Sequence, residues 1–267
     1  MKHLILGSAG QIGTALKKYL KSINEEVIEF DIKRTMDEDL RYETDNLESA
    51  VRQCDFVYFL AFDVGGAKYL DANQNKYSFI RNNMLIMSNT FMVLDHTKKP
   101  FIFASSPNYP TEGYGMLKQL GERMTVDIGG VVTRFWNVYD KEDKGVHAHV
   151  ITDFMDMAKN DGIIKMRTEG YETRQFLYGE DCAEALFTIS KNFDEIRKEP
   201  IQNITSFKWY TIKQVANMIS ELYGNTPIIP GNRGDGQNYN RIEPYKTSIV
   251  NFWQPKTELK DGIAILY

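Results

Sequence analysis

An α/β protein with a doubly wound parallel sheet is predicted, because short apolar runs alternate along the chain with segments of helical periodicity. The expected strands lie at residues 2–6, 27–31, 56–60, 101–104 and 131–134. The clearest expected helices lie at residues 11–20, 77–95 and 114–126. After Val138 the elements become shorter and less regular, which predicts a smaller C-terminal lobe interleaved with the sheet domain.

A glycine-rich segment, Gly7-Ser8-Ala9-Gly10-Gln11-Ile12-Gly13, joins the first expected strand to the first expected helix. Its glycines let backbone N–H groups at the start of the helix approach a pyrophosphate without a Cβ in the way. The second expected strand ends in Asp31, where a carboxylate would accept hydrogen bonds from the ribose hydroxyls of adenosine. A tight turn without a ligand is the alternative. The order of strand, glycines, helix, strand and acid favours a Rossmann domain that binds a dinucleotide.

The composition argues against several classes of function. The chain has 267 residues with 32 basic and 36 acidic side chains, and this balance predicts no nucleic-acid or anionic membrane partner. The two cysteines, Cys54 and Cys182, lack metal-ligand spacing, so neither a disulfide nor a metal site is expected. The first strand begins at residue 2, and no apolar run approaches the length of a membrane span. A cytoplasmic protein is therefore expected.

Tyr114 and Lys118 lie four residues apart, on one face of an expected helix. A cation beside a phenol stabilises the phenolate, so this pair predicts a tyrosine that exchanges protons near neutral pH. The same spacing also arises by chance on a solvated helix. Ser105 and Ser106 directly follow the fourth strand, at the edge where open parallel sheets bind ligands. Ordinary turn chemistry before Pro107 is the alternative for the two serines.

Taken in order, these segments resemble the extended short-chain dehydrogenase/reductase family, which contains nucleotide-sugar epimerases, dehydratases and reductases. The resemblance covers nearly the whole chain. It continues at Asp39-Leu40, Leu60-Ala61, Asn83, Glu122, Arg134-Phe135-Trp136-Asn137-Val138-Tyr139, Arg174-Gln175-Phe176-Leu177-Tyr178, Asp181, Arg233-Gly234-Asp235 and residues 253–263. It implies an NAD-dependent enzyme that acts on a nucleotide-diphosphate sugar.

The resemblance assigns roles to the catalytic residues. Tyr114 would be the acid/base, and Lys118 would lower its pKa and hold the nicotinamide ribose. Ser105 would orient the reacting oxygen. It is preferred to Ser106 because it precedes Tyr109 by four residues, which is the family's spacing.

The resemblance also implies how the cofactor is bound. Asp39 and Leu40 would lie against the adenine, and Leu60 and Ala61 would contact the cofactor as well. NAD is expected over NADP because Asp31 would repel a 2′-phosphate, although Lys33 and Arg34 leave NADP as the alternative. The NAD-binding domain would span residues 1–140, with contributions from about 165–190, and residues 141–267 would form mainly a substrate-binding lobe.

Three residues are implied to contact the diphosphate of the substrate, namely Asn137, Arg174 and Arg233. Guanidinium groups suit this role because they meet phosphate oxygens bidentately. A surface ion pair is the alternative for either arginine.

Residues 63–67 and 79–84 are most similar to the GDP-fucose synthases within the family, and His149-Val150-Ile151 is similar to the segment with their catalytic histidine. Pro107, however, replaces the cysteine that transfers a proton in that branch. The 4,6-dehydratases carry Asp-Glu where this chain has Ser106-Pro107. The expected chemistry is therefore hydride transfer at one carbon, C4. His149 remains a candidate catalytic base, but a substrate-lining or structural histidine is preferred.

The expected enzyme is thus an epimerase or a dehydrogenase/reductase. One alternative is an epimerase/reductase like GDP-fucose synthase, and another is a non-catalytic NAD-binding regulator of the same fold. A complete Ser/Tyr/Lys set argues against the regulator, whereas the short spacing of nine residues from Ser105 to Tyr114 favours it. A homodimer is expected, because the helices at 77–95 and 114–126 carry apolar residues on more than one face and would form a four-helix bundle about a two-fold axis.

Overall fold

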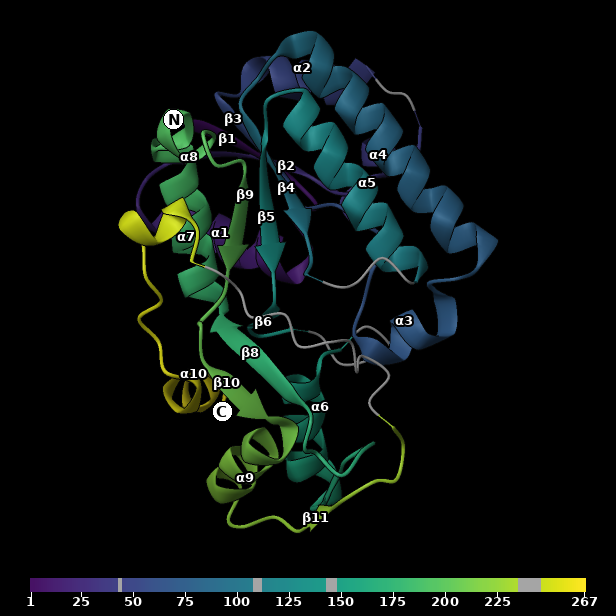
Figure 1. Cartoon of the computed structure of the whole chain (residues 1–267), viewed down its shortest axis with the longest axis vertical. Helices are drawn as coiled ribbons and strands as arrows, with labels where there is room; N and C mark the ends of the chain where they lie inside the picture. The colour runs from purple at the N-terminus through teal and green to yellow at the C-terminus, as the bar shows by residue number, and fades with distance from the viewer. Residues whose placement is uncertain (43–44, 108–111, 143–147, 235–245) are drawn as a thin grey trace.

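A six-stranded parallel sheet forms the centre of the larger lobe (Figure 1). The computed structural model describes residues 1–42, 45–107, 112–142, 148–234 and 246–267. The strand order is β2-β1-β3-β4-β5-β9, and all neighbouring strands are parallel. The strands are β1 Lys2–Leu6, β2 Glu26–Phe30, β3 Phe56–Phe59, β4 Phe101–Ser105, β5 Val131–Phe135 and β9 Ile201–Ile204. The predicted doubly wound α/β fold is confirmed.

The central strands are buried on both faces, as their continuous apolar sequences indicate. Every residue of β3 is buried, and successive side chains such as Tyr58 and Phe59 enter opposite cores. Helices α1 (Gln11–Ser22) and α7 (Gly179–Lys191) pack together on the core that contains Tyr58. The sheet is thus covered on both sides, which leaves its carboxyl edge for a ligand.

Three helices contribute to the core on the other face of the sheet, namely α2 Asp45–Gln53, α4 Tyr77–Thr97 and α5 Gly113–Asp127. Together with α1, helices α4 and α5 confirm the three helices expected from sequence. Both α4 and α5 lie on the outside of the lobe in Figure 1. No helix in the described ranges is long and apolar enough to cross a membrane.

The smaller lobe has its own core. A three-stranded sheet has the order β10-β8-β6, and a two-stranded sheet pairs β11 with β7. These strands are β6 Asn137–Tyr139, β7 Ile164–Lys165, β8 Thr173–Tyr178, β10 Trp209–Thr211 and β11 Ile228–Ile229. The helices packed into this core are α6 Val150–Asp156, α9 Ile212–Leu222 and α10 Leu259–Leu266, and a π-helical turn, Met157–Asp161, follows α6. Further short helices are α3 Ala67–Asn73, α8 Phe193–Ile196, η1 Met36–Glu38 and η3 Ser248–Asn251.

The chain passes between the two lobes several times, because β5 leads to β6, β8 leads to α7, and β9 leads to β10. Helix α7 falls within the segment 165–190 that was expected to return to the sheet domain. The strand in that segment, β8, instead pairs with β6 and β10, because Phe176 and Tyr178 pack into the core of the smaller lobe. The strand that does return to the large sheet is β9.

Candidate active site

A cleft of about 2100 Å³ lies at the carboxyl edge of the large sheet and extends to the smaller lobe. The large lobe contributes the glycine-rich loop and the segments that follow β2, β3 and β4. The smaller lobe contributes residues of β6, α6 and β8. Every site residue predicted from the sequence lines this cleft in the part of the chain that the structure describes.

The glycine-rich loop is packed too closely for side chains at two of its positions. A Cβ on Gly13 would lie 2.2 Å from the carbonyl oxygen of Gly7, and one on Gly7 would lie 2.7 Å from the Ala61 nitrogen. Gly7 also has a φ of +90°, which favours glycine. A Cβ on Gly10 would contact only the Gly7 oxygen, at 3.3 Å. The first amides of α1 have no acceptor within the helix and no side-chain cap, so this loop fits a pyrophosphate.

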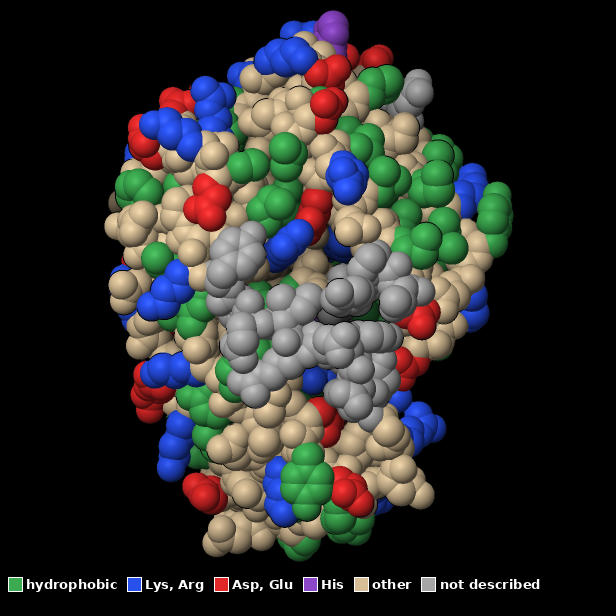
Figure 2. Space-filling model, viewed as in Figure 1, with side chains coloured by type: hydrophobic (Ala, Val, Ile, Leu, Met, Phe, Trp, Pro, Cys, Tyr) green, Lys and Arg blue, Asp and Glu red, His purple; other side chains and the backbone are tan. Residues whose placement is uncertain are grey.

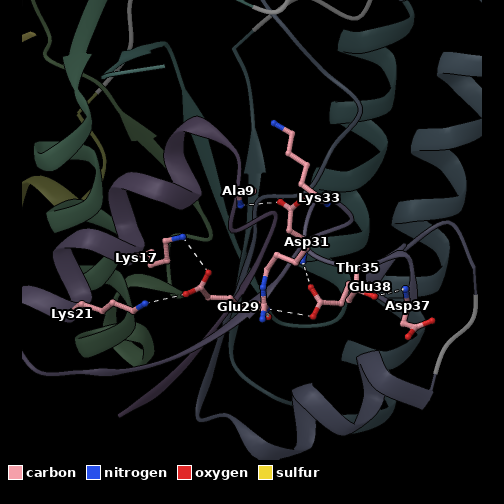
Figure 3. Close-up of polar contacts among 10 residues, drawn as sticks. Ala9, Lys17, Lys21, Glu29, Asp31, Lys33, Thr35, Asp37 and Glu38 are labelled. Atoms are coloured by element: carbon pink, nitrogen blue, oxygen red, sulfur yellow. Dashed lines mark hydrogen bonds and ion pairs between the residues drawn. The ribbon is translucent and has the colours of Figure 1, made fainter. Parts of the chain in front are cut away.

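Asp31 lies directly beside this loop (Figure 3). Its carboxylate accepts hydrogen bonds from the Ala9 backbone N–H at 2.9 Å and from the Lys33 backbone N–H at 2.8 Å. Arg34 points elsewhere, because its guanidinium donates to the carbonyl of Glu29 and pairs with Glu38 at 3.3 Å. The only guanidinium in this turn is therefore directed away from Asp31.

The Asp39–Leu40 pair forms a further part of the wall. Asp39 is buried, and the side chain of Arg41 donates to its carboxylate through Nε at 2.9 Å and Nη2 at 2.6 Å. This hydrogen bonding lowers the pKa of Asp39. The carbonyl of Leu40 accepts a hydrogen bond from Asn89 on α4 at 3.0 Å. Arg41 also lines the cleft and was missed by the sequence analysis, although it directly follows the recognised pair.

Tyr114 lies in the first turn of α5, beside Ser106. Desolvation raises the pKa of Tyr114 to about 12, and a hydrogen bond with the Ser106 side chain acts in the opposite direction. This direction corrects the expectation that Lys118 lowers the pKa of the phenol. The phenol is therefore protonated at neutral pH in this structure.

Lys118 is buried against the sheet, and its Nζ lies 5.7 Å from the centroid of the Tyr114 ring. Its Nζ donates to the carbonyl of Ala104 at 2.7 Å and lies 3.5 Å from the centroid of the Phe62 ring. Desolvation lowers the pKa of Lys118 to about 7, and the charge of Glu122 partly offsets this. Phe62 was not predicted from the sequence, where it is one apolar residue after a strand.

Ser105 and Ser106 both line the cleft but have different partners. Ser105 is the last residue of β4, is buried, and donates to Glu122 Oε1 at 2.6 Å. Glu122 in turn accepts two hydrogen bonds from Arg134, at 2.7 and 2.6 Å. Ser106 follows the strand and is the serine that contacts Tyr114. The preference for Ser105 was based on its spacing to Tyr109, which lies outside the described residues.

His149 precedes α6 and is held by Glu142. One oxygen of Glu142 accepts from the His149 backbone N–H at 2.6 Å, and the other lies 2.9 Å from Nδ1. Both residues line the cleft. The carboxylate thus fixes one edge of the imidazole. Sequence reasoning missed Glu142 because no motif marks it, and His147 lies outside the described ranges.

Asn137, Arg174 and Arg233 line the cleft from the smaller lobe. Asn137 begins β6, and Arg174 lies on β8, where its Nη1 donates to the carbonyl of Thr173 at 2.8 Å. The backbone N–H of Arg233 donates to the carbonyl of Arg167 at 3.0 Å. Two arginines of the smaller lobe thus border the same cleft as the glycine-rich loop. Asp235, the last residue of the recognised motif, lies outside the described residues.

Residues 3–205 match the NAD dependent epimerase/dehydratase family. The chain belongs to this family. NAD is accordingly its cofactor. Three features would hold it, namely the close-packed glycine-rich loop, the N-terminus of α1, which has no side-chain cap, and Asp31.

Two relatives share about a quarter of the sequence. The chain is 27% identical to GDP-mannose 3,5-epimerase 1 of Oryza sativa subsp. indica, over 98% of this chain and 80% of the relative. It is 26% identical to a putative UDP-glucose 4-epimerase of Methanocaldococcus jannaschii, over 97% and 95%. An epimerase of Methanothermobacter thermautotrophicus has the same fold, with a TM-score of 0.84 and 20% identity over 98% of this chain and 90% of the other.

Proposed function

We propose that this family member transfers hydride at a single carbon, C4, of a nucleotide-activated sugar, as an epimerase or as a dehydrogenase/reductase. The observation that carries the proposal is the placement of Ser106, Tyr114 and Lys118 in one cleft between the glycine-rich loop and the arginines of the smaller lobe. NAD supplies the hydride acceptor or donor when it is bound. Relatives named for GDP-mannose and UDP-glucose chemistry support a nucleotide sugar as the substrate class.

Tyr114 is proposed as the group that exchanges the proton at the sugar oxygen. With its pKa raised to about 12, the phenol carries a proton at neutral pH and can donate it to the sugar oxygen when a ketone is reduced. In the oxidation direction, the phenolate form of Tyr114 would accept the proton of the C4 hydroxyl. Ser106 would orient the reacting oxygen, because it already contacts the phenol. Lys118 would provide positive charge beside the phenol and the nicotinamide ribose in the complex.

Asn137, Arg174 and Arg233 are proposed to bind the diphosphate of the substrate. All three reach the cleft from the smaller lobe. Guanidinium groups stabilise phosphate oxygens strongly through paired hydrogen bonds. Replacing either arginine with glutamine is therefore expected to raise KM for the nucleotide sugar more than it lowers kcat.

His149 is proposed to line the substrate pocket rather than to exchange a proton with carbon. Pro107 stands in the segment after the serines and carries no exchangeable proton, so a two-carbon epimerisation would lack one of its acids. This interpretation also fits His149 Nδ1, which is already engaged by Glu142.

The experiment that tests the function is turnover of UDP-glucose and GDP-mannose in heavy water. Hydride transfer at C4 yields a 4-epimer or a 4-keto sugar without solvent deuterium at the neighbouring carbons. Deuterium at C3 or C5 that is lost in His149→Asn would instead assign His149 as a base and contradict the single-carbon chemistry. If the NAD-bound protein turns over neither sugar, a wider panel of nucleotide sugars is tested. A product from that panel would assign another nucleotide sugar as the substrate, and no product would contradict the proposal.

The chain is further proposed to form a homodimer through α4 and α5. Hydrophobic side chains gather on the upper right of Figure 2, over these two helices. Met84 and Met92 on α4 are 51% and 53% exposed, and Met116 and Leu120 on α5 are 58% and 47% exposed. A second copy would cover this apolar face by a two-fold packing of the helix pair.

A further inference from the structure

The turn after β2 holds an arginine close to the predicted ribose site but out of the cleft. Asp31, Lys33 and Glu38 line the cleft, whereas Arg34 does not. Arg34 is nevertheless only three residues after Asp31, and its backbone N–H donates to the carbonyl of Asp31 at 2.9 Å. An arginine near this position is a common ligand of the 2′-phosphate of NADP. Its withdrawal therefore needs a cause.

Glu38 is the residue that connects Arg34 to the Asp31 segment (Figure 3). Its Oε2 accepts a hydrogen bond from the backbone N–H of Asp31 at 2.7 Å, and its Oε1 pairs with Arg34 Nη1 at 3.3 Å. The side chain of Glu38 is 15% exposed, whereas that of Arg34 is 44% exposed. The carboxylate of Glu38 thus pairs with the more exposed guanidinium of Arg34, which also donates to the carbonyl of Glu29.

We propose that Glu38 is a second determinant of selectivity for NAD over NADP, because it holds Arg34 away from the position of a 2′-phosphate. The proposal rests on the placement of the adenosine ribose at Asp31. Asp31 acts by facing the ribose directly, whereas Glu38 acts as a positioning residue through Arg34.

Lys33 is the other cation of the turn, and it does not depend on Glu38. Its side chain extends away from Glu38 in Figure 3, and only its backbone N–H contacts Asp31. Any attraction of Lys33 for a phosphate is therefore the same with and without Glu38. A comparison of variants at positions 34 and 38 cancels this contribution.

The test is the pair of dissociation constants for NAD and NADP, measured by titration calorimetry on nucleotide-free protein. The variants are Glu38→Gln, Arg34→Gln and the double variant. The amide of Glu38→Gln keeps a side-chain oxygen for the Asp31 N–H but removes the charge that holds Arg34. Glu38→Gln is expected to bind NADP about tenfold more tightly, which corresponds to about 1.4 kcal/mol, while NAD affinity changes less than about twofold. The double variant is expected to lose most of that gain.

Asp37→Asn is the matched control, because Asp37 lies in the same short helix and is exposed. Its backbone N–H donates to the Thr35 hydroxyl. The variant is expected to leave the NAD/NADP ratio unchanged. The proposal is overturned if Asp37→Asn matches the gain, if the gain persists in the double variant, or if Glu38→Gln has no effect. Asp31→Asn distinguishes failure of the Glu38 role from failure of the placement of the ribose at Asp31. If Asp31→Asn relaxes the selectivity for NAD and Glu38→Gln does not, only the role of Glu38 is contradicted. When neither does, the placement of the ribose fails as well.

Discussion

At the scale of single residues, the proposed catalytic role of Tyr114 can be tested directly by substitution. Tyr114→Phe is expected to lower kcat by about 10²–10⁴-fold, as for the loss of a positioned acid/base, with NAD affinity close to normal. Tyr42→Phe, which removes an exposed phenol outside the cleft, is the control. Undiminished turnover of Tyr114→Phe would refute the assignment.

The two serines are expected to fail in different ways. Ser106→Ala should lower kcat by about 10²-fold, the scale of one lost donor to a reacting oxygen, with little change in stability. Ser105→Ala should lower the free energy of unfolding by about 1.5–3 kcal/mol, because it removes a buried hydrogen bond to the charged Glu122. Chemical denaturation and steady-state kinetics on both variants measure this. If Ser105→Ala lost turnover at full stability, Ser105 would be the serine that orients the reacting oxygen, as its spacing to Tyr109 predicts.

Lys118 should make the stability of the nucleotide-free protein depend on pH. Its pKa is lowered from 10.5 to about 7 in the fold, so between pH 7 and 10 the unfolded chain binds more protons than the folded one. The free energy of unfolding then rises with pH, by up to about 1.4 kcal/mol per pH unit. Urea unfolding at pH 7 and pH 9 should show this rise relative to Lys118→Met. Parallel pH dependence of the two proteins would show that Lys118 is not desolvated.

At the scale of elements, the junction of β1 and α1 separates folding from binding. A Cβ on Gly13 would overlap the Gly7 carbonyl at 2.2 Å, whereas one on Gly10 would only touch it at 3.3 Å. Gly13→Ala is therefore expected to cost about 1–3 kcal/mol of stability, as overpacking does. Gly10→Ala should leave stability within about 1 kcal/mol but weaken NAD binding at least about tenfold. Thermal unfolding and NAD titration distinguish the two variants. Equal losses of stability would contradict the expectation that a Cβ fits at Gly10 but not at Gly13.

At the scale of the whole molecule, the α4–α5 face provides a test of assembly. Met84→Glu combined with Met116→Glu places charges on an apolar face that a second copy would bury. The double variant is expected to sediment as a monomer at micromolar concentration, where the native chain sediments as a dimer. Ile265→Glu on α10, where the side chain is 63% exposed, is the control and should not change the mass. A monomeric native chain would remove the proposal.

The sequence by itself determined the parallel sheet, the glycine-rich loop, the Tyr114–Lys118 spacing and the family, because each depends on local periodicity or on a short motif. Tertiary structure decided the rest. The burial of the end of β4 turns Ser105 toward Glu122 and leaves Ser106 at the phenol. Lys118 Nζ donates to the carbonyl of Ala104 and packs against the ring of Phe62. Such contacts join residues far apart in the chain, and only packing determines which of several possible partners each polar group finds.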